Sequence, residues 1–453
     1  MFKQLLKATV IKILTWQAKL VLKKYNPKIV AVTGSVGKTS TKDAIFTMLS
    51  KFYFVRRSEK SFNSELGVPL TILGVPNGWN NPFVWIKNII EGLTLIVLPN
   101  LYPQWLVLEI GADRPGDIAS LTSWIKPDIG VVTRLSKMPV HVEYFLSVAE
   151  IVREKSFLIQ NTKREGIVVL NGDDEDVRAF QGLVENKIIF YGLKGADITF
   201  SDYVIEYLPA KNSLGISAGE PEEISSKISS GLNNEIQGIS FTVSNGKSSE
   251  QVKILRSIGL QHVYPVLASI AVSHALNLPF KKSAKAFKNY ETPAGRMKII
   301  KGIKDTIIID DTYNSSPVAL EEALKTLGEI MTKARKVAVL ADMLELGVYS
   351  VDEHRKLGVY VAKNADILIA AGLRTRALAE AAQDNGMSEK NIFQYNDSQD
   401  AGRELQNIIK EGDIILVKGS QGMRMERVVE EIMAEPDKKE ELLVRQDKEW
   451  QNR

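Results

Sequence analysis

A glycine-bearing turn near the start of the chain combines the residue types that bind nucleotide phosphates. It reads Thr33-Gly34-Ser35-Val36-Gly37-Lys38-Thr39-Ser40. Glycines let backbone N–H groups curl around phosphate oxygens, and a helix that starts at the turn adds its positive end. Lys38 can then reach the terminal phosphates, and the hydroxyl of Thr39 can bind Mg²⁺. We therefore expect residues 34–40 to bind ATP, through the compact form G-x-x-G-K-T, since position 32 is Val.

The residues around this turn predict a mainly parallel α/β sheet. The β-branched run at 28–32 is typical of a buried strand that leads into the turn, and helical periodicity follows at 42–51. Further strands are expected at 52–56, 105–109, 129–133 and 166–170. Strands that alternate with helices favour parallel pairing. Short strand-like pieces between about 197 and 256 predict a small β-rich extension, and a helical stretch follows at 263–289.

A second alternation of strands and helices begins after a break at Thr292-Pro293-Ala294-Gly295. Strands are expected at 306–309, 336–340, 367–371, 392–395 and 413–417. They predict a second α/β unit, so we place a domain boundary near 294. The expected domains are a basic amphipathic helix at 1–27, a central domain at 28–294, a C-terminal domain at 295–435 and a charge-rich tail at 436–453. The tail is expected to be a solvated helix or a frayed end.

Two segments have compositions that bear on where the protein works. Residues 1–27 carry six lysines and no acidic residue, interleaved with apolar residues at the spacing of an amphipathic helix. Residues 79–105 are too apolar for a solvent loop, yet charged residues and prolines argue against a membrane span. The two segments either pack on the protein itself, which we favour, or form a peripheral membrane-facing patch through residues 1–24 and 79–105.

The overall composition excludes several classes of function. With 44% hydrophobic and 25% charged residues the chain has the profile of a folded soluble protein, and it has no cysteine and only four histidines. Disulfides, thiolate zinc sites, iron–sulfur clusters and cysteine nucleophiles are therefore excluded, and a reducing compartment fits. Because the basic charge is concentrated in residues 1–27, nucleic-acid binding is not indicated.

An ordered series of further motifs resembles the Mur ligase family of ATP-dependent amide-forming enzymes. It comprises Phe62-Asn63-Ser64-Glu65-Leu66-Gly67-Val68-Pro69-Leu70-Thr71, Leu108-Glu109-Ile110-Gly111-Ala112, Gly295-Arg296-Met297, Asp310-Asp311-Thr312-Tyr313-Asn314-Ser315-Ser316-Pro317, Leu340-Ala341-Asp342-Met343-Leu344-Glu345-Leu346-Gly347, and Val417-Lys418-Gly419-Ser420 with Met425-Glu426. The resemblance covers roughly residues 28–434. Within the family, the motifs are most similar to those of the branch that adds D-alanyl-D-alanine to a nucleotide-linked muramoyl tripeptide. It implies a P-loop-type central domain and a Rossmann-like α/β C-terminal domain.

The resemblance also assigns roles in the central domain. Glu109 resembles the family's magnesium ligand, His141 its second-metal histidine, and Lys155 the lysine that the family carbamylates. Carbon dioxide adds to a neutral amine and turns a cation into an anionic oxygen ligand, which suits a hard metal. Two alternatives stay open. In the first, His141 is a partly buried histidine whose nitrogen atoms are satisfied by hydrogen bonds. In the second, Lys155 is a surface lysine on a solvated helix face.

Further nucleotide contacts are implied in both domains. Arg296 would contact phosphate, Asp311 the ribose or a metal, and Lys418 would neutralise the reacting group. A separate domain can bring these residues in by closure only when substrates are bound, which limits futile ATP hydrolysis. Asn171 and Asp174 either contact adenine or simply cap a turn.

The chain departs from the family pattern at three places. Gln261 and His262 stand where a His-Asn pair is common, with Pro265 in place of a second amide, and we expect the pair to keep polar contacts to the nucleotide. Ser64 replaces a usual asparagine. The family's N-terminal domain, which grips the uridine nucleotide, needs at least about 50 residues. Only 27 residues precede the first expected strand, so we expect the donor's carrier group to be held differently or to be a different carrier.

These observations and the resemblance predict a cytoplasmic ATP- and Mg²⁺-dependent ligase of peptidoglycan synthesis. The resemblance alone implies a monomer. ATP converts a carboxylate, which is a poor electrophile, to an acyl phosphate, and an amine then expels phosphate. Metal ions and cations must neutralise the charge that gathers, which makes Lys38, His141, Lys155 and Lys418 the expected catalytic residues. The expected substrates are small molecules, a muramoyl-peptide precursor and D-alanyl-D-alanine or a similar amine. The alternatives are a ligase for another, lipid-linked carboxylate and a nucleotide-responsive binding protein without turnover.

Overall fold

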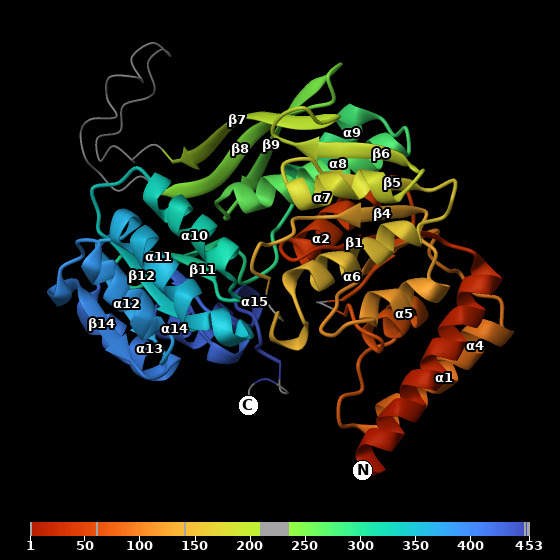
Figure 1. The fold of residues 1–453 in the computed structure, drawn as a ribbon, viewed down its shortest axis with the longest axis horizontal. Helices are drawn as coiled ribbons and strands as arrows, with labels where there is room; N and C mark the ends of the chain where they lie inside the picture. The colour runs from red at the N-terminus through yellow and green to blue at the C-terminus, as the bar shows by residue number, and fades with distance from the viewer. Residues whose placement is uncertain (1, 60–61, 140–141, 209–234, 448–449, 451–453) are drawn as a thin grey trace. The chain divides into compact units, whose positions relative to one another are not determined.

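The computed structural model describes residues 2–59, 62–139, 142–208, 235–447 and 450, and their side chains except those of 2–7. The chain forms two compact units (Figure 1). The first unit comprises residues 1–202, 241–252 and 261–290, and the second comprises 203–240, 253–260 and 291–453. Each unit combines strands with helices, as the sequence predicts.

A nine-stranded sheet has the order β2-β3-β1-β4-β5-β6-β7-β8-β9. Its strands are β1 Lys28–Thr33, β2 Val55–Arg57, β3 Trp105–Glu109, β4 Ile129–Val132, β5 Ile167–Asn171, β6 Lys187–Gly192, β7 Ile198–Tyr207, β8 Ile236–Ser244 and β9 Ser249–Leu255. All pairs from β2 to β7 are parallel, which confirms the predicted pairing. The strand predicted at 52–56 starts later, because Phe52 and Tyr53 donate backbone N–H bonds to Leu49 at the end of the preceding helix.

Helices cover both faces of the first six strands. They are α1 Phe2–Tyr25, α2 Lys38–Leu49, α3 Gly67–Leu73, α4 Pro82–Val97, α5 Asp117–Trp124, α6 Val148–Gln160, α7 Glu175–Ala179, α8 Val263–Ala275 and α9 Phe280–Lys285. Ile29 and Ala31 of β1 belong to a core that includes residues of α1, α3 and α5. Val30 and Val32 are equally buried and, because side chains alternate along a strand, point to the opposite face.

The apolar segment 79–105 contains helix α4, which packs on α1 (Figure 1). Gln17 of α1 donates from Nε2 to the carbonyl oxygen of Ile89 at 2.8 Å. At Gly92 an added Cβ would lie 2.4 Å from Gln17 Oε1, so the helices cross where only glycine fits. Lys24 Nζ donates to three carbonyls at the end of α4. The predicted packing on the protein is therefore confirmed. Among the described residues no helix is long and apolar enough to span a membrane.

The second unit contains a six-stranded sheet of order β10-β11-β15-β12-β13-β14. Its elements are β10 Lys298–Lys301, β11 Ile307–Asp311, α10 Pro317–Glu329, β12 Lys336–Ala341, α11 Ser350–Asn364, β13 Ile367–Ala371, α12 Thr375–Asp384, β14 Ile392–Tyr395, α13 Ser398–Ile408, β15 Ile414–Lys418, α14 Glu426–Ile432 and α15 Lys439–Leu442. Every pair is parallel except β10 with β11. Leu443, beyond α15, is buried in the core of this unit. The prediction that the tail is solvated or frayed is therefore wrong at this position.

Candidate active site

The glycine-bearing turn joins β1 to α2, and its shape depends on close packing against the end of β4. Gly37 has φ 84° and ends the turn, so α2 begins at Lys38 rather than at the predicted position 42. Gly34 has φ 145°, and a Cβ there would lie 1.9 Å from Thr133 Oγ1. That hydroxyl lies 2.7 Å from the carbonyl oxygen of Val36. A larger residue than glycine would therefore displace the turn from β4.

The Lys38 side chain folds back over the turn. Its Nζ donates to the carbonyl oxygen of Gly34 at 2.9 Å and contacts that of Ser35 at 3.4 Å. The backbone N–H of Ser35 donates to the carbonyl oxygen of Arg134 at 2.8 Å. These contacts hold the ammonium group at the turn.

Glu109 stands at the end of β3, in register with Val32 of β1. Its side chain is buried, and Oε1 accepts a hydrogen bond from Asn63 Nδ2 at 3.1 Å. Oε2 is buried with no hydrogen-bond partner among the described residues. A buried carboxylate oxygen without a partner is costly, and a bound cation removes that cost. Glu109 and the Thr39 hydroxyl carry oxygen atoms of the kind that Mg²⁺ prefers, and their role as its ligands stays a prediction.

Lys155 on α6 is buried, so the alternative of a surface lysine is wrong. It lines a small cavity together with Lys38, Asn63 and Asp113. Burial and, to a smaller extent, the ammonium of Lys38 together lower the pKa of Lys155 to about 7, against the opposing charges of Glu154 and Asp113. An amine with this pKa is uncharged in about half of the molecules at pH 7, and the uncharged form can act as a nucleophile.

The neighbour of Lys155 is not part of a solvated face either. Glu154 is buried and accepts backbone N–H bonds from Gly116, Ile118 and Ala119 at 3.0, 2.7 and 3.2 Å. It therefore caps the start of α5. This contact fixes α6 beside α5 and holds Lys155 toward the cavity.

Asp174 and Asn171, which were expected either to contact adenine or to cap a turn, both cap turns in the structure. The Asp174 carboxylate accepts the backbone N–H of Val177 at the start of α7 and that of Leu135, at 3.1 and 2.7 Å. The Asn171 side chain accepts the N–H of Asp173 at 3.0 Å. The capping alternative is confirmed for both residues. Their contact with adenine stays a prediction.

Gln261 and His262, the polar pair expected to contact the nucleotide, lie directly before α8. His262 is buried in the 3-10 turn Leu260–His262 that leads into α8. Gln261 Oε1 is buried and has no hydrogen-bond partner among the described residues, as expected of an atom that binds a ligand. His141 lies outside the described residues, so its predicted role at a metal is not tested.

In the second unit the structure brings two predicted nucleotide contacts together. Asp311 and Lys418 stand in register on the neighbouring strands β11 and β15. Both are buried, and Lys418 Nζ lies 2.5 Å from Asp311 Oδ2 and 3.0 Å from the carbonyl oxygen of Asn314. The guanidinium of Arg296 stacks over the ring of Tyr313 at 4.0 Å. The charge of Lys418 is therefore balanced by Asp311 in this structure.

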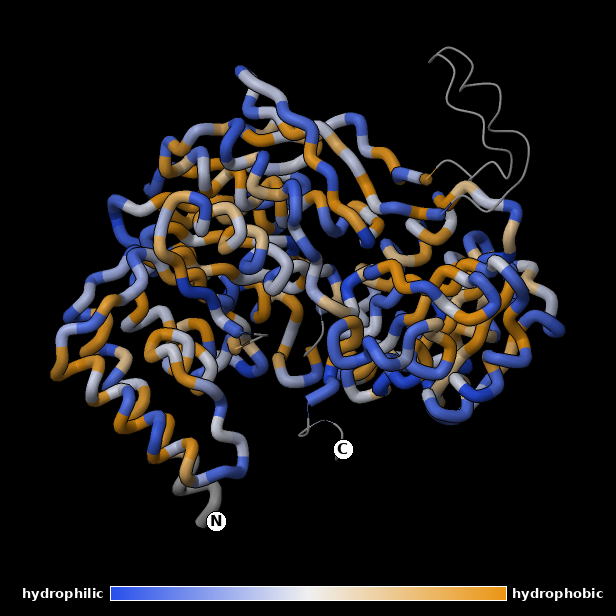
Figure 2. Tube along the Cα trace, turned by 180° about the vertical axis from the view of Figure 1, so that it is seen from behind, coloured by the Kyte–Doolittle hydropathy of each residue, from blue (hydrophilic) through white to orange (hydrophobic). Residues whose placement is uncertain are grey.

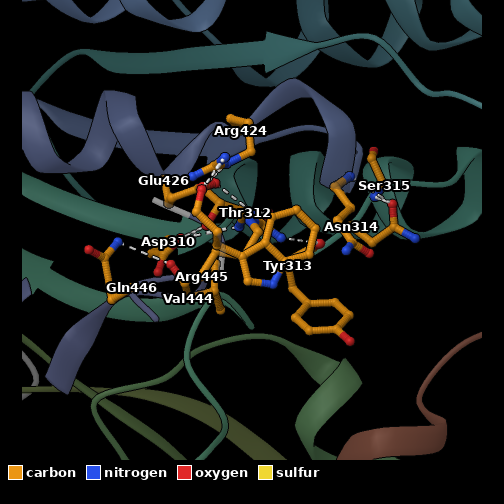
Figure 3. Close-up of polar contacts among 12 residues, drawn as sticks. Asp310, Thr312, Tyr313, Asn314, Ser315, Arg424, Glu426, Val444, Arg445 and Gln446 are labelled. Carbon is orange, nitrogen blue, oxygen red and sulfur yellow. Dashed lines mark hydrogen bonds and ion pairs between the residues drawn. The ribbon is translucent and has the colours of Figure 1, made fainter. Parts of the chain in front are cut away.

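The sequence analysis missed a buried ion-pair cluster that anchors the segment after β11 (Figure 3). Arg445 donates to the carbonyl oxygens of Thr312 and Tyr313 at 2.6 and 3.0 Å, and to Glu426 Oε2 at 2.6 Å. Arg424 donates to the other oxygen of Glu426 at 2.5 Å. Burial alone would raise the pKa of Glu426, but the two arginines outweigh it and hold the pKa below its usual value. Glu426 lay in a recognised motif, whereas nothing in the sequence singled out Arg445.

Asp310 lies in the same cluster as a second buried carboxylate. Its Oδ1 accepts bonds from the backbone N–H and the hydroxyl of Thr312, at 3.1 and 2.6 Å. Oδ2 has no partner among the described residues. Burial raises the pKa of Asp310 to about 6, against the lowering effect of the Thr312 bonds. This carboxyl is therefore a cost of folding at neutral pH.

Comparisons with known proteins agree with the architecture and the turn. An α/β fold with a phosphate-binding loop, a buried carboxylate and a buried lysine defines an ATP-handling protein. Residues 92–273 match the family model of the Mur ligase middle domain, and residues 295–421 match that of the Mur ligase, glutamate ligase domain. The chain belongs to the Mur ligase family.

Several of the relatives share one enzyme name. The chain is 25% identical over 420 residues to a UDP-N-acetylmuramoyl-tripeptide–D-alanyl-D-alanine ligase of Bacillus subtilis, covering 92% of this chain and 79% of that one. The enzyme of that name from Escherichia coli is 24% identical over 407 residues, covering 89% and 76%. A crystal structure of MurF ligase from Thermotoga maritima in complex with ADP has TM-score 0.72 and 24% identity, covering 95% and 84%.

Proposed function

We propose that the protein is an ATP- and Mg²⁺-dependent ligase that adds D-alanyl-D-alanine, or a similar dipeptide, to a muramoyl-peptide precursor of the cell wall. The observation that supports the chemistry best is the shared cavity of Lys38 and Lys155, beside a buried Glu109 with an oxygen left to bind a cation. The substrates are inferred from the names of the relatives, which join these two molecules.

The residues of the first unit divide the work on the nucleotide. The turn at 34–40 and Lys38 bind the phosphates of ATP and neutralise the group that is transferred to the substrate carboxylate. Mg²⁺, when bound, supplies charge stabilisation to the phosphates. Glu109 and the Thr39 hydroxyl would hold it. In the second half-reaction the amine attacks the acyl phosphate, the C–N bond forms, and phosphate leaves with the bonding electrons.

Lys155 acts in the proposed mechanism as a carbamate. Its neutral amine forms a bond to the carbon of CO₂ and releases a proton, which leaves a carbamate with one negative charge. The cavity gives the new group room, and the ammonium of Lys38 is the nearest cation that would balance its charge. His141 would join Lys155 as a second metal ligand. The modified side chain would then offer an anionic oxygen ligand to a metal ion in place of a positive charge.

Arg296, Asp311 and Lys418 are proposed to contact the same nucleotide from the second unit, and Asn171 and His262 from the first. The ion pair of Lys418 with Asp311 has a consequence for this step. Lys418 can neutralise a phosphate only when Asp311 turns to another partner, such as the ribose or a metal. Binding of ATP would thus exchange one partner of Lys418 for another, so that its charge is used only in the loaded state.

We place the enzyme in the cytoplasm as a monomer that acts on small molecules. A ligase for a lipid-linked carboxylate is a second candidate, and the exposed apolar side chains of α4 are the observation that favours it. A donor screen separates the two: turnover with a lipid-linked but not a uridine-linked donor selects the second.

The test of the function is phosphate release from ATP by the full-length protein. We expect release only when both the muramoyl tripeptide and D-alanyl-D-alanine are present, and loss of it in Lys38→Ala. Lys51→Ala, at the other end of α2 and exposed, is the matched control and should keep full activity. Release that ignores the acceptor, or ATP binding without turnover, would contradict the ligase.

A further inference from the structure

We propose that the exposed face of α4, together with lysines of α1, docks the protein on the surface of an anionic lipid bilayer. We call the side chains of Phe83, Ile86, Ile90, Leu93, Val97, Leu98 and Leu101 the α4 face. This surface is separate from the proposed active site, and the inference does not depend on the ligase activity.

The α4 face is a regular stripe on one side of a helix. Phe83, Ile86, Ile90, Leu93 and Val97 follow one another at spacings of three and four residues. This spacing places them in one line along the helix axis. All are exposed, from 42% for Leu93 to 79% for Phe83. The chain continues the apolar surface beyond the helix with Leu98 and Leu101. Contiguous exposed apolar surface of this kind marks an interaction site.

The opposite side of α4 is fully engaged, so the stripe is not an unfolded or frayed element. Asn88 and Gly92 are buried, and Gln17 of α1 bonds to the Ile89 carbonyl. The side chain of Asn81 accepts N–H bonds at the start of the helix, and Lys24 donates to carbonyls at its end. α4 is therefore a helix held rigidly by the fold with one apolar side left uncovered.

Charge on α1, the helix that packs against α4, identifies the partner. Residues 1–27 contain six lysines and no acidic residue, and Lys12, Lys19 and Lys23 are exposed on α1. Trp16 is exposed among them. Figure 2 shows apolar and polar stretches alternating along the α1 and α4 pair. An apolar stripe accompanied by lysines and tryptophan is the composition of a helix that lies in the headgroup region of an anionic bilayer.

Insertion across a bilayer does not fit this segment. α4 has 16 residues, or about 24 Å of helix, against a hydrocarbon thickness of about 30 Å. A second copy of the chain or a soluble protein could also cover apolar side chains. Neither occupant explains why the adjoining helix carries only positive charge, and a second copy would bring like charges together. A negatively charged lipid surface accounts for both features.

The experiment is sedimentation of the full-length protein with lipid vesicles. Vesicles of phosphatidylcholine alone are compared with vesicles that contain about 30% phosphatidylglycerol. We expect binding to the anionic vesicles, weakened by salt. Ile86→Gln with Ile90→Gln should weaken it roughly tenfold or more. Lys12→Gln with Lys23→Gln should remove the preference for anionic lipid.

The matched control is Val348→Gln with Leu373→Gln, which replaces two apolar residues of the second unit that are more exposed than Ile86 and Ile90. It should bind vesicles as the wild type does. Thermal unfolding and ATP-dependent phosphate release, measured on every variant, should be unchanged because all these positions are exposed. Absent binding by the wild type, or binding that survives the α4 change, overturns the proposal. A dimer in solution that the α4 change dissociates, without vesicle binding, assigns the α4 face to a second copy and also overturns it.

Discussion

Removal of carbon dioxide should inactivate the protein reversibly, because Lys155 is expected to work as a carbamate. An unperturbed lysine, with pKa 10.5, is neutral in roughly one molecule in three thousand at pH 7. The pKa of about 7 at Lys155 leaves about half of the amines neutral, so burial raises the reactive fraction about a thousandfold. At pH 6 only about a tenth is neutral. Because carbamate formation also releases a proton, a sparsely populated carbamate at fixed dissolved CO₂ should fall about fiftyfold from its value at pH 7.

The assay is carbon-13 NMR of the full-length protein with labelled bicarbonate, at pH 7 and pH 6. One carbamate signal should appear, weaken at the lower pH, and be absent in Lys155→Gln. Phosphate release should fall after degassing and return with bicarbonate, and short carboxylic acids should partly rescue Lys155→Ala. A protein that shows no labelled signal with CO₂ supplied, and whose turnover is indifferent to degassing, would refute the reasoning.

Three further outcomes follow from buried carboxylates. Glu109→Gln should raise the Mg²⁺ concentration needed for half-maximal phosphate release without lowering the melting temperature; an unchanged Mg²⁺ titration would contradict the assigned ligand. Arg445→Met leaves Glu426 buried without one of its partners and should cost about 3–5 kcal/mol in urea unfolding, whereas Lys439→Met, in a half-exposed pair, should cost about 0–1 kcal/mol; equal losses would argue against the cluster. The raised pKa of Asp310 means that the folded state binds the extra proton between pH 3.8 and about 6, so its contribution to stability is lost as pH rises through that window. Asp310→Asn should therefore gain up to about 3 kcal/mol over the wild type at pH 7 but not at pH 4, by urea unfolding at both pH values.

Local chemistry predicted the parallel strands and the phosphate-binding turn. The run at 105–109 is β3 over the predicted residues, since four consecutive apolar side chains before Glu109 are typical of a strand that is buried on both faces. The two glycines of the turn are needed for different reasons: at Gly34 close packing against Thr133 leaves no room for a side chain, whereas Gly37 has a φ of 84° that favours glycine.

Contacts between residues that lie far apart in the sequence were not predictable. Lys418 and Asp311 were both identified as nucleotide contacts, but their pairing over 107 residues depends on β15 lying next to β11. Arg445 reaches Thr312 over 133 residues from a segment whose charges favoured a solvated tail. Charge composition indicates that a segment can be solvated; only the fold decides whether a buried carboxylate such as Glu426 needs that charge.

Among the described residues, the buried charged groups near the phosphate-binding turn differ from Glu426 in how completely they are paired. Near the phosphate-binding turn, Glu109 keeps an oxygen without a partner and Lys155 has lost most of its preference for the charged form. Such arrangements cost stability and persist where a ligand or a chemical modification relieves them. Glu426, in contrast, has an arginine on each oxygen. The first arrangement suits a site that must receive phosphate and metal, and the second suits an anchor that must keep the segment after β11 in place.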